Sequence, residues 1–519
     1  MLDIKHIKER IYSDKLVDYA EKLTNLYIEN TTPEYRKSKG QFFTPKSISE
    51  FMVRQFFEID KKDEIRILDA GAGIGIFISA ICDLLISKRN RPKVIFDLYE
   101  NDGNIQPYLL ENMKICKEVM QEKGFILRYR VFKDNFITKN LNFIEKGPSK
   151  IKYAGNYDFV ISNPPYYKIK KDSPYDKELK RILKRQPNIY ILFMAISAKL
   201  LKNGGQLTVI TPRSYCSGQY SSNFRKWFFA DLKPTRIHVF DSRKEVFKRQ
   251  NVLQEMIILT GIKDQVNPKY VLVSKTKGEI KKREEINKRK TKYTNCVIKN
   301  DNDIIIRIPT SKNDELLARK IDKQGFTLDA LGMKISTGPV VPFRANAYLK
   351  NNSIDKENYV PLIWMQNIKN GKIFWPVEIN NKPIAIRKSE KTKKMLVPNK
   401  NYVLIKRFSA KEGKRRIDAG VFLKKWINSE FIGIENHVNY IYKINGDLTE
   451  DEAYGLASIF NSKIYDRFFQ IINGSTQVNA TEIMNIPLPN IEKIKKIGRL
   501  SIKKGRMASE RLIIRTLDY

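Results

Sequence analysis

The sequence predicts an α/β fold, in which a mostly parallel sheet is flanked by helices, followed by a C-terminal α+β domain. Short apolar stretches typical of buried strands recur at residues 65–69, 94–99, 156–162, 205–211 and 254–260. Stretches with helical character lie between them, among them residues 189–196. This alternation is typical of a parallel sheet with helices on its faces. After residue 260 the sequence becomes more polar and more basic, which indicates a different organisation.

The first apolar strand runs into a glycine-rich turn. Asp69 ends the strand, and Gly71, Gly73 and Gly75 follow before the next helical stretch. Glycine lets the backbone approach a ligand closely. The spacing differs from the dinucleotide-binding fingerprint, and an acidic residue at the strand end disfavours a pyrophosphate. The turn therefore predicts a binding site for a ligand that carries positive charge.

Glu100 ends the second apolar strand and adds to this predicted site. Its distance in sequence from the glycine-rich turn is roughly that at which nucleotide-binding α/β folds place a carboxylate on ribose hydroxyls. A nucleoside with a methylsulfonium group satisfies both Asp69 and Glu100, because it offers a ribose and a cation.

The turn Asn163-Pro164-Pro165-Tyr166 directly follows the apolar strand of residues 156–162. Proline fixes φ and extends the residue before it, so the Asn163 side chain and the Pro164 carbonyl become fixed acceptors. Tyr166 adds an aromatic face. An exocyclic amine of a nucleobase needs two acceptors, and its ring needs a surface for stacking. The turn predicts such a site, and a proline-stiffened loop without a ligand is the alternative.

Basic residues after the last predicted strand indicate a connector. They are Lys275, Lys277, Lys281, Lys282, Arg283, Lys288, Arg289, Lys290 and Lys292. Such a run is typical of a solvated helix or linker, and contact with phosphate is the alternative. We therefore expect a first domain over residues 1–265, a basic connector over 266–330 and a second domain over 331–519.

The charge balance predicts a polyanionic partner. The 519-residue chain has 96 Lys and Arg against 57 Asp and Glu, a formal net charge of +39. Such a field attracts nucleic acid, although lysine usage in an AT-rich genome also raises the charge. No apolar stretch is long enough to span a membrane, and the N-terminus lacks the core of a signal peptide. We therefore expect a cytoplasmic protein that does not bind membranes.

Histidines and cysteines are few and predict no metal site. His6, His238 and His437 lie far apart, without the spacing of metal ligands. The four cysteines are also scattered, and reduced thiols are expected in the cytoplasm.

In their order along the chain, these motifs resemble the γ-class DNA methyltransferases, which methylate amino groups with S-adenosyl-L-methionine. Residues 39–45, with Phe43 and Thr44, resemble the leading motif that holds the methionine end of this cofactor. The glycine-rich turn, Glu100 and the Asn163 turn follow in the family's order. The resemblance implies a Rossmann-like methyltransferase domain in residues 1–265. It also implies a target base that flips out of the duplex into the site.

Two further positions are implied by the resemblance. Residues 133–137 resemble the motif whose polar residue meets the cofactor adenine and whose aromatic residue, here Phe136, packs on it. The family usually has Asp-Phe, so either Asp134 or Asn135 takes the polar role. Phe247 lies where relatives stack an aromatic residue on the flipped base, and a core phenylalanine is the alternative.

The second half of the chain narrows the resemblance. Residues 336–344, 407–411 and 473–482 are similar to BsuBI/PstI-type adenine methyltransferases of type II restriction-modification systems. This implies that residues 331–519 recognise a target in double-stranded DNA, which in relatives is CTGCAG. It also implies a cognate restriction endonuclease as functional partner, without a stable complex. We expect the chain to act as a monomer.

Other functions stay open at this point. The Asn-Pro-Pro-Tyr turn also serves methylation of protein glutamine, and an RNA methyltransferase is a further alternative. Those enzymes are compact, whereas a basic second domain favours long nucleic acid as substrate. Cytosine-N4 methylation is chemically close to adenine-N6 methylation. A DNA-binding subunit without activity is disfavoured, because the cofactor and catalytic motifs are complete.

Overall fold

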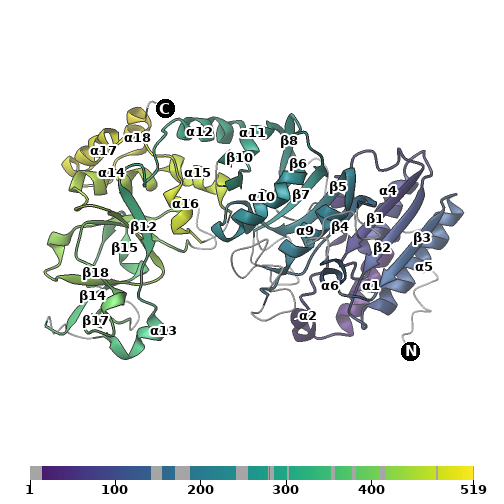
Figure 1. Ribbon diagram of the computed structural model, residues 1–519, viewed down its shortest axis with the longest axis horizontal. Coiled ribbons are helices and arrows are strands. Elements are labelled where there is room, and N and C mark those ends of the chain that lie inside the picture. The colour runs from purple at the N-terminus through teal and green to yellow at the C-terminus, as the bar shows by residue number, and fades with distance from the viewer. Residues whose placement is uncertain are drawn as a thin grey trace. The chain divides into compact units, whose positions relative to one another are not determined.

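The computed structural model forms two compact units, Met1–Thr310 and Ser311–Tyr519 (Figure 1). It describes residues 15–141, 155–169, 188–240, 255–276, 278, 280, 286–300, 303–351, 357–376, 382–409, 415–474 and 477–517. Each unit has its own buried core and is described by itself.

A nine-stranded sheet lies at the centre of the first unit, in the order β3-β2-β1-β4-β5-β7-β6-β8-β9. Its strands are β1 (Glu64–Ala70), β2 (Lys93–Tyr99), β3 (Leu127–Phe132), β4 (Tyr157–Ser162), β5 (Leu201–Pro212), β6 (Leu232–Phe240), β7 (Met256–Lys263), β8 (Tyr270–Thr276) and β9 (Asn287–Lys292). Strands β1 to β5 pair in parallel, whereas β7 is antiparallel to β5 and β6. The chain runs outward from β1 to β3 and then returns to the other side of β1, so the strand order reverses between β1 and β4. In such sheets ligands bind at the carboxyl ends of the strands beside this reversal.

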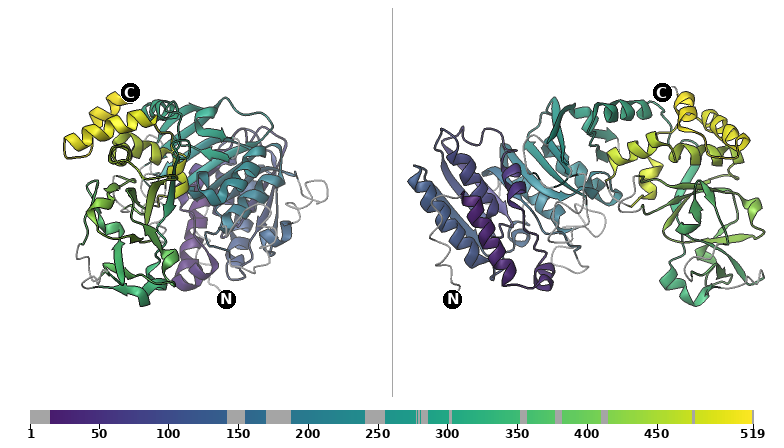
Figure 2. Two further views of the ribbon diagram at one scale, coloured as in Figure 1. Left: turned by 60° about the vertical axis from the view of Figure 1, so that its left-hand side comes forward. Right: turned by 180° about the vertical axis from the view of Figure 1, so that it is seen from behind.

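Helices cover both faces of this sheet (Figures 1 and 2). One face is covered by α1 (Leu16–Glu29), α3 (Lys46–Val53), α4 (Ile76–Ile86) and α5 (Gln106–Glu122). The other is covered by α6 (Phe136–Asn140), α9 (Ile189–Leu200) and α10 (Ser222–Asp231). Successive strand residues enter the two cores in turn, as Ile67 and Leu68 do. Because both faces are buried, the strands are continuously apolar, and this is why the sequence reveals them.

The predicted fold class is confirmed, but the predicted basic connector differs from the structure. Residues 266–310 belong to the first unit, where β8 and β9 extend the sheet. The remaining short elements of this unit are α2 (Pro33–Lys39), α11 (Tyr293–Cys296), β10 (Val297–Asn300) and β11 (Asp303–Ile306). Strand β9 is an edge strand, and most of its charged residues are exposed. Charged edge strands resist pairing with other chains, which gives the basic run a physical reason. Lys277, Lys281, Lys282 and Arg283 lie outside the described residues.

The second unit is α+β. One sheet has the order β12-β22-β19-β20-β16-β15, and another has the order β13-β17-β14-β21-β18. The strands are β12 (Met333–Thr337), β13 (Leu349–Lys350), β14 (Tyr359–Ile363), β15 (Ile368–Lys369), β16 (Lys372–Ile373), β17 (Ala385–Arg387), β18 (Leu396–Pro398), β19 (Tyr402–Lys406), β20 (Ala419–Phe422), β21 (Phe431–Ile434) and β22 (Val438–Lys443). The helices are α12 (Lys312–Asp322), α13 (Pro342–Ala345), α14 (Glu450–Phe460), α15 (Lys463–Ile472), α16 (Ala480–Met484), α17 (Ile491–Lys503) and α18 (Glu510–Thr516). Helices α14 and α17 cross closely, since a Cβ atom at Gly498 would lie 1.8 Å from the Asp451 carbonyl oxygen.

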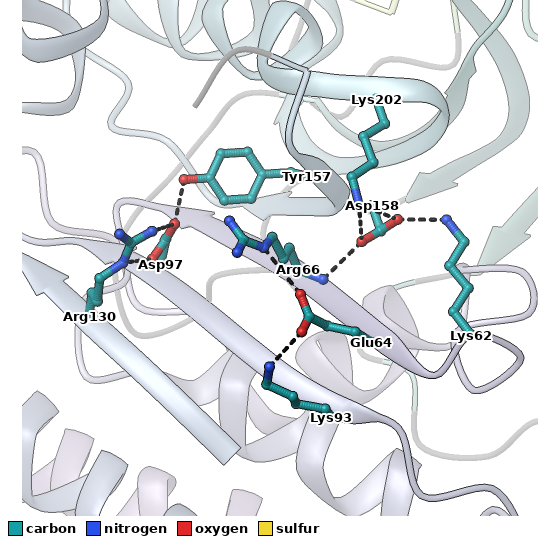
Figure 3. A network of polar contacts seen from close by, with 9 residues as sticks. All are labelled: Lys62, Glu64, Arg66, Lys93, Asp97, Arg130, Tyr157, Asp158 and Lys202. Carbon is teal, nitrogen blue, oxygen red and sulfur yellow. Dashed lines mark hydrogen bonds and ion pairs between the residues drawn. The ribbon is translucent and has the colours of Figure 1, made fainter. Parts of the chain in front are cut away.

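A buried carboxylate ties the amino ends of β1, β4 and β5 together (Figure 3). The Asp158 carboxylate accepts hydrogen bonds from Lys62 Nζ at 2.6 Å, the Arg66 backbone N–H at 2.9 Å and Lys202 Nζ at 3.0 Å. Burial raises the pKa of Asp158, but these three donors outweigh burial and lower the pKa below its ordinary value of 3.8. In the same view Asp97 accepts from Arg130 and Tyr157. The Asp158 contacts lie at the amino ends of the strands, whereas Asp97 and Arg130 face each other within β2 and β3.

We predict that Asp158→Asn lowers the free energy of unfolding by about 1–3 kcal/mol at pH 7, because three donors lose a charged acceptor. A carboxyl whose pKa is lowered by folding stabilises the fold above its unfolded pKa. That stabilisation is lost as the pH falls through the folded value. The difference between wild type and variant should therefore shrink below about pH 4. Urea unfolding at several pH values measures this, and equal stability at pH 7 would contradict the role of Asp158.

Candidate active site

A cavity of about 250 Å³ opens where β1, β2 and β4 end. Nine of the residues predicted for the site line it: Phe43, Gly71, Gly73, Glu100, Asp134, Asn135, Phe136, Asn163 and Pro165. Thr44 lines a smaller cavity of about 40 Å³ that shares Gly71, Gly73 and Asn163 with the first. Asp69, Gly75, Pro164 and Tyr166 are not part of either lining, but each lies within two residues of a lining residue in the chain.

The glycine-rich turn shapes one wall of the cavity. Its backbone N–H groups at Gly71 and Ala72 donate to the Tyr99 carbonyl, at 3.1 and 2.9 Å, and so tie β1 to the end of β2. Gly75 begins α4 with a φ of 86°. A Cβ atom there would lie 2.9 Å from Leu109, so only glycine fits both the backbone and the space.

Asp69 is fully buried in β1, and Ala70 separates it in sequence from Gly71 in the cavity wall. Among the described residues, neither of its carboxylate oxygens has a hydrogen-bond partner. Burial raises the pKa of Asp69 well above its ordinary value of 3.8, and the charge of Glu100 raises it further. A buried carboxylate without a partner is costly unless a positive charge comes near it. Asp69 therefore fits a cationic ligand in the cavity.

Glu100 faces the cavity in a fixed orientation. Its carboxylate accepts from the backbone N–H groups of Gly73 at 3.0 Å and Asp102 at 2.8 Å. Burial raises the pKa of Glu100, while these two donors act in the opposite direction. A carboxylate can accept about four hydrogen bonds, so these donors leave capacity on Glu100 for a ligand hydroxyl.

Sequence reasoning missed a polar network around Gln41 and Asp102, which both line the cavity. The Asp102 carboxylate accepts from Tyr35 Oη at 2.9 Å and from Gln41 Nε2 at 2.6 Å, and Tyr27 Oη donates to Gln41 Oε1 at 3.1 Å. These bonds hold the segment around Gln41 against the carboxyl end of β2. Two features of the sequence could have indicated this network. Asp102 is an acidic residue only two positions after Glu100, and Gln41 lies within residues 39–45, which were already assigned to the site.

Asp134 and Asn135 differ in how free they are to bind a ligand. Asn135 Oδ1 caps helix α6, because it accepts from the backbone N–H groups of Ile137 at 3.0 Å and Thr138 at 3.2 Å. The Asp134 side chain is 49% exposed, and its carboxylate lies 3.4 Å from Lys139 Nζ. The neighbouring Phe136 is buried, with its ring centre 5.1 Å from that of Tyr99.

The Asn163 side chain is held by the segment that precedes α3. Its amide nitrogen donates to the Phe42 carbonyl at 2.8 Å and to Thr44 Oγ1 at 2.9 Å. Its amide oxygen accepts from Tyr166 Oη. Asn163 also lines both cavities, so the proline turn and the glycine-rich turn meet at one place.

The tyrosines after the prolines occupy different positions. The Tyr166 ring stacks on Phe42 with 5.5 Å between ring centres, and its hydroxyl also lies 3.0 Å from the Ile210 carbonyl. Tyr167 is 44% exposed and lines the larger cavity beside Gly40. Phe247 lies outside the described residues, so the structure does not place it.

Metal and membrane features were sought in the described residues alone. Those residues hold no group of three or more His, Cys, Asp or Glu side chains suited to a metal ion. Among the same residues, no helix is both long enough and apolar enough to cross a bilayer. All four cysteines are buried, and their thiols are reduced.

The chain is similar to known methyltransferases of restriction-modification systems. Residues 70–247 match the family model for the Eco57I restriction-modification methylase. The chain is 34% identical over 498 residues to the type II methyltransferase M.BsuBI of Bacillus subtilis, covering 94% of this chain and 96% of the relative. It is also 34% identical over 489 residues to the type II methyltransferase M.PstI of Providencia stuartii, covering 93% and 92%.

A solved structure shares the fold across most of the chain. The type IIL restriction-modification enzyme MmeI, in complex with DNA, has a TM-score of 0.53 at 13% identity and covers 91% of this chain and 71% of its own. The full-length similarity to M.BsuBI and M.PstI confirms the resemblance seen in the motifs. This chain belongs to the family of type II methyltransferases of restriction-modification systems that includes M.BsuBI and M.PstI.

Proposed function

We propose that this chain is a DNA methyltransferase that transfers a methyl group from S-adenosyl-L-methionine to N6 of adenine within a specific duplex site. Membership of the type II methyltransferase family supports methyl transfer in a restriction-modification system. One observation carries the proposal further. Asn163 lines the cavity, and its amide nitrogen is hydrogen-bonded to the Phe42 carbonyl in the cavity wall. The proposed site for the methyl donor and the proposed site for the target amine therefore lie at the same edge of the sheet.

The cavity residues suit S-adenosyl-L-methionine. Glu100 has free lone pairs for the ribose hydroxyls, as carboxylates at this position of α/β folds do. Asp69 is buried in β1, and it supplies negative charge once the cationic part of the cofactor offsets the cost of its burial. Asp134 accepts a hydrogen bond from the adenine amino group of the cofactor, because the side-chain oxygen of Asn135 already accepts two backbone hydrogen bonds as the cap of α6. Phe136 and Tyr99 offer an apolar surface to the adenine ring.

The transfer itself needs positioning more than acid or base chemistry. When bound, the cofactor supplies an electrophilic methyl group on a sulfonium. Asn163 Oδ1 and the Pro164 carbonyl accept hydrogen bonds from the target amine and turn its lone pair toward the methyl group. Tyr166 and Phe247 are the proposed stacking partners of the extruded base, whose flipping costs a few kcal/mol.

The second unit supports DNA as the substrate. It carries aromatic side chains beside cations: Phe343 is 78% exposed, and the Arg344 guanidinium lies 5.3 Å from its ring centre. Lys350 Nζ lies 4.9 Å from the ring centre of Tyr359. Such pairs suit contacts with bases and phosphates. The second unit then recognises the target, with a CTGCAG-like site as the family expectation. The enzyme acts as a monomer in the cytoplasm and protects DNA from a cognate endonuclease.

The first prediction concerns the modified base. Expression of the chain in a methylation-deficient bacterial host should place N6-methyladenine at one short sequence motif, which long-read sequencing maps. N4-methylcytosine at that motif would contradict the adenine assignment. Unmodified DNA from a folded protein that binds S-adenosyl-L-methionine would favour RNA or protein glutamine as the substrate.

The second prediction concerns Asn163. Asn163→Ala should slow methyl transfer about 100- to 1000-fold, because the target amine loses a preorganised acceptor. DNA affinity should change by less than about threefold, since this contact forms only with the extruded base. Single-turnover kinetics and fluorescence anisotropy measure the two quantities. Asn90→Ala, an exposed asparagine that contacts the Asp60 carbonyl, is the matched control. Weaker DNA binding with normal turnover would refute the catalytic role.

The third prediction separates Asp134 from Asn135. Asp134→Ala should weaken cofactor binding about 5- to 100-fold, because a charge-assisted hydrogen bond to the adenine amino group is lost. Asn135→Ala should weaken cofactor binding by less than about threefold and lower stability by about 1 kcal/mol through loss of the helix cap. Isothermal titration calorimetry and urea unfolding measure these effects. The opposite order of cofactor affinities would assign the adenine contact to Asn135.

A further inference from the structure

We propose that the hydroxyl groups of Thr44 and Tyr166 are positioning groups that fix the orientation of the Asn163 carboxamide. This inference rests on the proposed function, since it concerns how Asn163 presents its oxygen to the target amine. It assigns Thr44 a role other than cofactor binding and gives the Tyr166 hydroxyl a role separate from that of its ring.

The orientation of the carboxamide follows from its neighbours. The Phe42 carbonyl accepts hydrogen bonds and cannot donate, so the Asn163 group 2.8 Å from it is the NH₂ group. Thr44 Oγ1, at 2.9 Å, accepts the second N–H. The Asn163 oxygen then faces Tyr166 Oη, which donates to it. All three polar partners agree on one orientation of the amide.

The Thr44 hydroxyl is placed to hold Asn163. Thr44 is 6% exposed and lines the smaller cavity of about 40 Å³, whereas Phe42 and Phe43 line both cavities. Its hydroxyl meets Asn163, which lies 119 residues further along the chain. Thr44 therefore acts on the reaction through Asn163.

The Tyr166 hydroxyl holds the opposite side of the same carboxamide. Its single proton has two acceptors within reach, the Asn163 oxygen and the Ile210 carbonyl at 3.0 Å. A carboxamide oxygen has two lone pairs, so the bond from Tyr166 leaves one for the target amine. The ring meanwhile rests on Phe42.

Loss of either hydroxyl loosens the carboxamide. An amide that rotates by half a turn presents N–H groups to the target amine, and two donors then oppose each other. Misplacement of a catalytic group by about 1 Å is enough to cost on the order of 100-fold in rate. The effect belongs to methyl transfer and leaves donor binding unchanged.

Three variants test the proposal in the full-length protein with duplex DNA and S-adenosyl-L-methionine. Thr44→Val removes the hydroxyl and keeps the shape, Thr44→Ser restores the hydroxyl, and Tyr166→Phe keeps the ring. We expect single-turnover methyl transfer to slow about 10- to 100-fold in Thr44→Val and Tyr166→Phe. Thr44→Ser should stay within about threefold of wild type, and the donor dissociation constant should stay within about twofold in all three.

Control variants remove hydroxyls of the same kind elsewhere. The Thr235 hydroxyl donates to the Thr260 carbonyl, and the buried Tyr465 hydroxyl donates to the Pro487 carbonyl. Thr235→Val and Tyr465→Phe should transfer methyl groups at the wild-type rate. Thermal melting of every variant confirms that it folds. A Thr44→Val protein that does not fold leaves Thr44→Ser and Tyr166→Phe to decide, and normal turnover in Tyr166→Phe then overturns the proposal.

The double variant Thr44→Val/Tyr166→Phe gives the sharpest result. Because both hydroxyls act on one carboxamide, the double variant should be little slower than the slower single variant. Rate losses that multiply would overturn the shared role, and so would a higher donor dissociation constant with normal turnover in Thr44→Val. Failure of the proposed function looks different, because wild type itself would then leave adenine unmethylated.

Discussion

Two hydrogen bonds from the Asn163 amide, to the Phe42 carbonyl and to Thr44, join the segment in the cavity wall to the proline turn after β4. The sheet makes this junction possible. Strands β1 and β4 are parallel neighbours at the point where the strand order reverses, so the turns that follow them emerge side by side. Burial of both sheet faces fixes the positions of the strands and requires apolar residues within them. The residues that follow the strands lie outside this core, so they can be polar and can contact a ligand.

Much of the first unit could be predicted from the sequence. Strands β1, β2, β4 and β7 are apolar runs because helices cover both faces of the sheet. Strand β9 could not be predicted in this way. An edge strand needs few apolar residues, so its lysines resemble those of a solvated linker. The second unit contains many strands of two or three residues, which are too short for any periodicity to show.

Site residues could be predicted from the sequence where a polar side chain directly follows an apolar strand. Glu100 and Asn163 are polar residues that directly follow apolar runs, and both line the cavity. Contacts between distant segments could not be predicted. The bond between Thr44 and Asn163 and the network around Asp102 depend on how the chain before α3 returns to the sheet. No local sequence pattern shows that the chain before α3 packs against the ends of the strands. The resemblance in residues 39–45 indicated only that this segment belongs to the site.

The central claim is that Asn163 presents its oxygen to the amino group of an extruded adenine while its nitrogen stays bonded to the cavity wall. A crystal structure of the chain with a non-reactive cofactor analogue and duplex DNA tests this most directly. The account predicts adenine N6 about 3 Å from Asn163 Oδ1, with Asn163 Nδ2 still on the Phe42 carbonyl. A target adenine that remains stacked in the duplex while the cavity holds the analogue would contradict it. So would an Asn163 side chain turned away from the cavity.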